Sequence, residues 1–167
     1  MKKDNIKIII ISLLIILLIG GIVVGVKQKI KPKEITLEKY ANIEDIKFDK
    51  NKVNAYFFWR DGCEHCKTEY EYLNELNKKY NKKLNIYALN IWTDPKNEEL
   101  LNKFIDVTQD ESIRNGVPLL FIGDEKYFGF GLGKYEKESE EDVLKMIKRQ
   151  LKKGNDYDIY KIIKENN

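Results

Sequence analysis

The sequence is poor in the residues that mark several special classes of protein. Its 167 residues include two cysteines, three prolines and ten glycines. These low counts exclude a disulfide-stapled scaffold and a collagen-like chain. A hydrophobic content of 43% with 11% aromatics also excludes a wholly disordered chain. One globular domain with an ordinary core is therefore expected.

Arginine is also scarce, occurring only as Arg60, Arg114 and Arg149, and the positive charge is unevenly spread. The net charge is +3, but residues 1–34 hold seven lysines against two acidic residues, which leaves −2 for the rest. The basic excess therefore belongs to the N-terminal segment, and no basic patch is expected on the globular part. Nucleic acid is not an expected partner, whereas membrane lipid is.

One long stretch, residues 8–26, lacks any charge. As a helix rising about 1.5 Å per residue it spans roughly 28 Å, close to the ~30 Å core of a bilayer. It predicts an uncleaved signal anchor, a single transmembrane helix; a cleaved signal peptide and a buried core helix are the alternatives. The expected organisation is a tail over 1–7, the anchor over 8–26, a stalk and lead-in over 27–47, a globular domain over 48–152 and a C-terminal tail over 153–167.

Lysines flank this run on both sides, so the positive-inside rule does not fix its orientation. An N-terminal anchor before one small domain is a common design of exported proteins. We therefore expect a single-pass protein of the cell membrane with its domain outside the cytoplasm.

Apolar periodicity predicts strands alternating with helices. The expected elements are a short helix over 36–46, a strand over 54–59, a helix from Cys66 to Tyr80, a strand over 84–91, a helix from Pro95, strands over 119–122 and 126–130 joined as a hairpin, and a helix over 138–151. This order predicts an α/β fold, a mixed sheet flanked by helices on both faces.

The only two cysteines, Cys63 and Cys66, lie at the transition from a strand to a helix. A helix N-terminus favours an anion, so Cys63 is expected to be a reactive thiolate and Cys66 to resolve its mixed disulfides. Between them, a protonated His65 would stabilise the thiolate and Glu64 would oppose it.

A Cys-x-x-Cys pair also has roles other than redox chemistry. A zinc half-site, a purely structural disulfide and two unrelated buried cysteines remain alternatives, although zinc needs further ligands and His65 is the only histidine. A haem-attachment motif is excluded because Lys67 stands where it needs histidine. Redox chemistry is favoured, with no metal and no cofactor expected.

Three segments occur in order: Phe57-Phe58-Trp59-x-x-Gly62-Cys63-x-x-Cys66-Lys67, Leu84-Asn85-Ile86-x-x-Leu89-Asn90-Ile91 and Ile113-Arg114-x-Gly116-Val117-Pro118-x-Leu120-Phe121. Together they resemble the thioredoxin-like superfamily over about residues 48–152. The resemblance implies a thiol-disulfide oxidoreductase acting on protein thiols or disulfides. It also implies a cis Pro118 beside Cys63, with Val117, Pro118 and Trp59 binding substrate; a trans proline at the strand entry is the alternative.

The sequence also departs from thioredoxin. Gly62 replaces the tryptophan before the first cysteine, and Glu64-His65 replaces Gly-Pro. The buried acid of thioredoxin would fall on Phe57 and its companion lysine on Ala88, so that proton-transfer pair is not expected.

The residues around the cysteine pair do not fix the direction of electron flow. His65 and Val117 are similar to the extracytoplasmic thiol oxidases, whereas Glu64 and the anchor are similar to anchored reductases of exported thiols. Either direction requires a redox-recycling partner in or outside the membrane. The alternative from another class is a non-catalytic binding or accessory module for an exported partner, using the Val117-Pro118 surface and the aromatic residues Trp59, Tyr127, Phe128 and Phe130.

Overall fold

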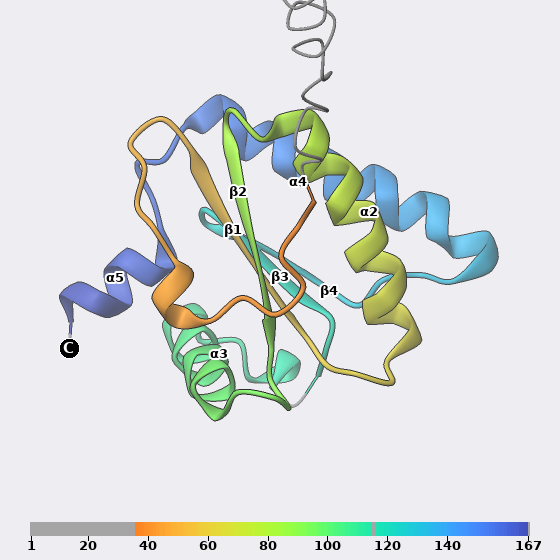
Figure 1. Cartoon of the computed structure of the whole chain (residues 1–167), viewed down its shortest axis with the longest axis horizontal. Coiled ribbons are helices and arrows are strands. Elements are labelled where there is room, and N and C mark those ends of the chain that lie inside the picture. The colour runs from red at the N-terminus through yellow and green to blue at the C-terminus, as the bar shows by residue number, and fades with distance from the viewer. Residues whose placement is uncertain (1–35, 115, 167) are drawn as a thin grey trace, which may run out of the picture. The chain divides into compact units, whose positions relative to one another are not determined.

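The computed structural model describes residues 36–114 and 116–166. A four-stranded sheet in the order β2-β1-β3-β4 lies at its centre (Figure 1). The strands are β1 Val53–Trp59, β2 Leu84–Asn90, β3 Leu119–Ile122 and β4 Glu125–Phe128. Since β1 runs parallel to β2 and antiparallel to β3, and β3 pairs with β4 as a hairpin, the predicted mixed sheet is confirmed.

Helices cover both faces of this sheet. In the described residues the α-helices are α2 Glu64–Tyr80, α3 Pro95–Thr108, α4 Glu136–Lys153 and α5 Ile159–Glu165, and the short 3-10 helices are η1 Ile43–Asp45, η2 Glu111–Ile113 and η3 Gly133–Tyr135. One core cluster joins the sheet to α2 and α4, and the other joins it to α3 and α5 (Figure 1).

The central strand β1 explains this arrangement. All seven of its residues are buried. Side chains alternate across a strand, so Phe57 enters the core under α2 and α4 while Phe58 enters the core under α3 and α5. A strand covered on both faces needs a continuous apolar run, which is what the sequence provides here. The strand thereby holds the residues that follow it at a defined edge of the sheet.

The C-terminal segment, expected as a tail over 153–167, contributes α5 to the second core. Ile159 and Tyr160 of this helix are buried. Asp158 caps the helix by accepting from the Tyr160 N–H at 3.0 Å, and it also accepts from the Tyr56 hydroxyl at 2.8 Å. Burial first, and then the Asp158 charge, raise the pKa of Tyr56, so its hydroxyl keeps the proton that it donates. The cap therefore fastens α5 to the central strand.

The lead-in segment differs from its prediction. The helix expected over 36–46 is absent, and only η1 forms there. Ala41 instead makes a parallel bridge with Leu89, and its N–H donates to the Ala88 carbonyl at 3.0 Å. Because the free edge of β2 satisfies this backbone, the segment is extended, although Leu37 and Ala41 are buried as their apolar character suggests.

The predicted anchor over 8–26 lies outside the described residues. Within 36–114 and 116–166, no helix combines the length and the apolar character that crossing a bilayer requires.

Candidate functional site

The two cysteines lie where β1 ends and α2 begins, toward the bottom of Figure 1. Gly62 turns the chain with a φ of +73°, a conformation that favours glycine. Cys63 then caps α2, its Sγ accepting from the N–H of Cys66 at 3.1 Å. The predicted placement of Cys63 at a helix start is confirmed, and the donor N–H would stabilise a thiolate on that sulfur.

Cys63 and Cys66 form a disulfide with a Cα–Cα distance of 5.2 Å. The two sulfurs are not equally accessible, because Cys63 is partly exposed and Cys66 is fully buried. An incoming thiolate can therefore reach Cys63, and Cys66 is shielded from it.

The peptide bond between Val117 and Pro118 is cis, as the resemblance implies. The Val117 carbonyl oxygen lies 4.0 Å from the Cys63 sulfur, and Pro118 is buried beside it. The fold thus brings together two segments more than fifty residues apart in the chain. Val117 stays partly exposed, and its predicted role in binding substrate remains a prediction.

Glu64 and His65 both occupy the exposed first turn of α2. The His65 ring is held in place, because its Nδ1 lies 2.5 Å from the carbonyl oxygen of Phe130. A carbonyl only accepts hydrogen bonds, so Nδ1 is the donor in this contact. Their opposite effects on the Cys63 thiolate stay a prediction.

Trp59, which was expected to bind substrate, is not exposed on the surface. It is only 3% exposed and belongs to the core cluster under α2 and α4. Its ring lies under the Lys39 ammonium at 5.0 Å and near the Tyr40 ring, with centroids 5.3 Å apart. Trp59 can therefore meet a substrate only as the wall of the adjoining hollow. Of the other aromatics proposed for a binding surface, Phe130 is buried and Phe128 is half exposed.

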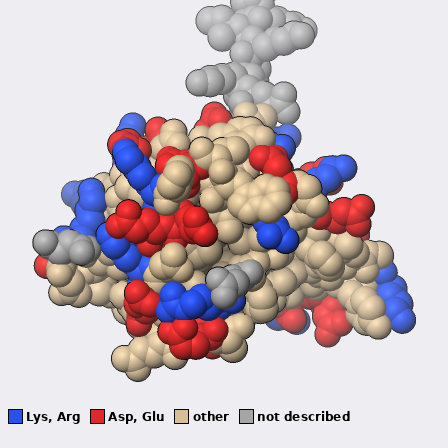
Figure 2. Space-filling view, turned by 90° about the horizontal axis from the view of Figure 1, so that it is seen from below, with Lys and Arg blue, Asp and Glu red and all other residues tan. Residues whose placement is uncertain are grey.

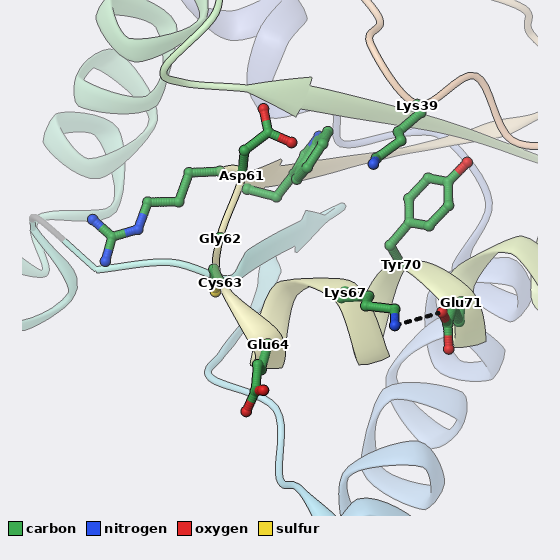
Figure 3. Close-up of a pocket in the computed structure, with 10 residues that line it drawn as sticks. Lys39, Asp61, Gly62, Cys63, Glu64, Lys67, Tyr70 and Glu71 are labelled. Atoms are coloured by element: carbon green, nitrogen blue, oxygen red, sulfur yellow. Dashed lines mark ion pairs between the residues drawn. The ribbon is translucent and has the colours of Figure 1, made fainter.

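A hollow of about 360 Å³ adjoins Cys63 (Figure 3). Aromatic rings of Trp59 and Tyr70 line it, and its rim carries three basic and three acidic side chains: Lys39, Arg60, Lys67, Asp61, Glu64 and Glu71. Lys67 is turned toward Glu71, with their charged atoms 3.9 Å apart (Figure 3). Figure 2, a view from below Figure 1, likewise shows both signs of charge interspersed. No single charge sign therefore selects a substrate at this end.

Glu69 is the main residue that the sequence patterns did not single out. It lies on the buried face of α2, one turn after Cys66, and is fully buried. Neither carboxyl oxygen has a hydrogen-bond partner in the described part of the chain. Burial raises the pKa of Glu69 well above its ordinary value, so the protonated carboxyl is favoured. The sequence does hold a signal for this residue, because Glu69 is an acidic residue within the apolar stripe of the helix that includes Cys66 and Leu73.

Asp61 positions the loop that carries the cysteines. Its carboxylate accepts from the Tyr40 hydroxyl at 3.2 Å and from the Asn90 side-chain amide at 3.0 Å. Asn90 is buried at the end of β2, and its side-chain Oδ1 accepts from the Trp92 N–H at 2.8 Å. This network ties the ends of β1 and β2 to the lead-in segment. Only the fold brings its members together.

No group of three or more His, Cys, Asp or Glu side chains suited to a metal ion occurs in the described ranges.

Comparisons with known proteins give distant likenesses. No protein-family model and no curated protein matches the chain. A solved thioredoxin-like protein from Clostridium perfringens is 18% identical, covers 72% of this chain and 89% of its own, and gives a TM-score of 0.44. Thioredoxin-2, a component of malaria parasite protein secretion machinery, is 23% identical over 67% of this chain and 96% of its own, with a TM-score of 0.41. A glutaredoxin from Archaeoglobus fulgidus is 17% identical over 55% and 86%, with a TM-score of 0.36.

The description of the fold therefore depends on the chain's own topology. The mixed sheet with helices on both faces, the cis proline and the cysteine pair at the start of α2 fit a thioredoxin-like α/β fold.

Proposed function

We propose that this chain is a membrane-anchored thiol-disulfide oxidoreductase that acts on thiols of exported proteins through Cys63 and Cys66. The observation that carries the proposal is the difference in exposure between the two bonded cysteines at the start of α2. Cys63 is partly exposed and Cys66 is buried. The 19-residue apolar run over 8–26 supports the anchor, and an anchored small domain is suited to exported substrates.

The chemistry is thiol-disulfide exchange. A substrate thiolate attacks Cys63 Sγ, a mixed disulfide forms, and Cys66 leaves as a thiolate. A second substrate thiolate then attacks the substrate sulfur of that bond and releases Cys63. Overall, two electrons and two protons pass from the substrate to the pair: two substrate thiols become one disulfide, and the Cys63–Cys66 disulfide becomes two thiols. The reverse sequence reduces a substrate disulfide, and a recycling partner sets the direction.

Glu69 supplies the proton that this exchange needs on the buried side. A thiolate on Cys66 would be a buried charge, which is unfavourable unless it is neutralised. Glu69 lies one helical turn away on the same face and favours its protonated form. It can give a proton to Cys66 as that sulfur leaves, and take one back when Cys66 attacks.

A matched assay distinguishes this function from a non-catalytic binding module. Wild-type protein and a Cys63→Ser variant are compared in insulin reduction and in oxidation of a dithiol peptide. We expect activity in at least one direction for wild type, and only the uncatalysed rate for the variant, because Cys63 is the accessible sulfur. Equal rates for the two proteins, or no activity in either, would favour the binding module.

A further inference from the structure

A basic face lies at the far ends of α2 and α4, and it was not expected from the sequence. Five lysines line a hollow of about 500 Å³ there, with no acidic residue among its lining: Lys79, Lys82, Lys83, Lys148 and Lys152. The prediction that the globular part carries no basic patch is therefore wrong. Three of these lysines follow or end α2 and two belong to α4, so only the packing of the helices brings them together.

A neighbouring hollow extends this basic face. It shares Lys83 and Leu151 with the first hollow and adds Lys50 and Lys52. Among the described residues, Lys82, Lys83, Lys148 and Lys152 take part in no ion pair, whereas Lys153 nearby pairs with Asp124 at 2.8 Å.

Helix ends explain only part of this cluster. Lysines in the last turn of a helix are favourable, which accounts for Lys79 and Lys152. Lys82 and Lys83 follow α2, and Lys148 lies more than a turn before the end of α4. Unpaired like charges repel one another, so an external anionic surface would relieve their repulsion.

The chain enters the described domain beside the middle of α2. The Leu37 N–H donates to the Asn74 side chain at 2.7 Å, and the Leu37 carbonyl accepts from the Tyr70 hydroxyl at 2.8 Å. At 1.5 Å per residue, Tyr70 lies about 9 Å along the axis from the start of α2, and Asn74 lies about 8 Å from Lys79. The entry point is thus about as near to the basic face as to the cysteines.

The connection to the apolar run is also short. Nine residues, 27–35, separate that run from the first described residue, and fully extended they span roughly 30 Å at most. An anchored domain therefore stays close to the bilayer. Soluble polyanions are not held near the lysines in this way.

We propose that the basic face contacts the anionic surface of the bilayer in which the chain is anchored; this inference rests on the anchor proposed above. The contact orients the domain. Cys63 lies at the opposite end of α2, about 26 Å along the helix axis from Tyr80, so this contact would hold the redox site away from the lipid.

Lysine footprinting of the full chain tests this directly. The protein is placed in nanodiscs of neutral phosphatidylcholine, or of phosphatidylcholine with phosphatidylglycerol, and exposed lysines are acetylated and quantified by mass spectrometry. We expect acetylation at Lys82, Lys83, Lys148 and Lys152 to slow about fivefold in the anionic nanodiscs, and the effect to vanish in about 1 M salt. Lys67 and Lys137, near the starts of the same helices, serve as internal controls and should be unchanged.

A charge variant sharpens the test. Replacing Lys82, Lys83 and Lys148 by glutamine should remove the protection of Lys79 and Lys152, whereas the same change at Lys67, Lys134 and Lys137 should preserve it. Equal acetylation in both nanodiscs would overturn the proposed lipid contact, but it would not contradict the proposed membrane anchor. Stronger protection by soluble polyglutamate at equal anionic charge would assign the face to a soluble partner instead. A chain that fails to float with neutral vesicles would contradict the anchor, and the inference with it.

Discussion

A Cys66→Ser variant, reduced and then exposed to glutathione disulfide, should accumulate as a stable mixed disulfide through Cys63. Cys63 is partly exposed and caps α2, so its thiolate can attack an external disulfide. With Cys66 absent, no neighbouring thiol can release the product. Intact-protein mass spectrometry should find the folded variant almost fully modified.

The reciprocal variant is the matched control. Cys63→Ser leaves Cys66 as the only thiol, and that sulfur is fully buried. The folded protein should therefore stay unmodified under the same conditions, and it should react only after denaturation. Equal modification of the two folded variants would contradict the assignment of Cys63 as the attacking sulfur.

Glu69→Gln should lower the exchange rate and also change how stability depends on pH. In the folded protein the pKa of Glu69 lies well above 4.5, because its carboxyl is buried without a partner. The folded state therefore keeps a proton that the unfolded chain loses above about pH 4.5. Relative to the variant, wild type should lose up to about 1.4 kcal/mol of unfolding free energy per pH unit between the unfolded and folded pKa values.

Two measurements separate the proton-transfer role of Glu69 from its effect on stability. Denaturant unfolding at pH 5 and pH 8 reports the stability difference, which should grow with pH in favour of the variant. In the variant, the pH profile of the exchange rate should lose the limb that reflects titration of the Glu69 carboxyl. The exchange rate of the variant should also be lower at pH 8, where the variant is at least as stable as wild type, so a loss of stability would not explain it. Glu75→Gln, an exposed change on the same helix and outside the hollow beside Cys63, should alter neither. A variant as active as wild type across the pH range would remove Glu69 from the proposed mechanism.

Local sequence patterns predict much of this fold because each element carries its own signal. The apolar run over 54–59 can only be buried on both faces, and Gly62 marks the turn that places Cys63 at a helix start. The hairpin after Ile122 follows from a short turn between two apolar segments. These features depend on residues close together in the chain.

The remaining features depend on contacts between distant segments. The lead-in residues were expected to form a helix, but the free edge of β2 pairs with Ala41 instead. Trp59 appeared available to substrate, yet α2 and the Lys39 side chain cover it. The basic face exists only because α2 and α4 end side by side. Glu69 is the exception, since helical spacing from Cys66 already places it on the buried face.

A glutathione redox titration of wild-type protein shows whether Cys63 and Cys66 act as one redox pair. The two thiols are counted by alkylation and mass spectrometry. Both cysteines should convert together in one two-electron transition, with a potential between about −120 mV, typical of an oxidant, and −270 mV, typical of a reductant. Its position within that range would also assign the direction of electron flow. A pair that stays fully oxidised or fully reduced across the titration, or cysteines that titrate independently, would contradict the account.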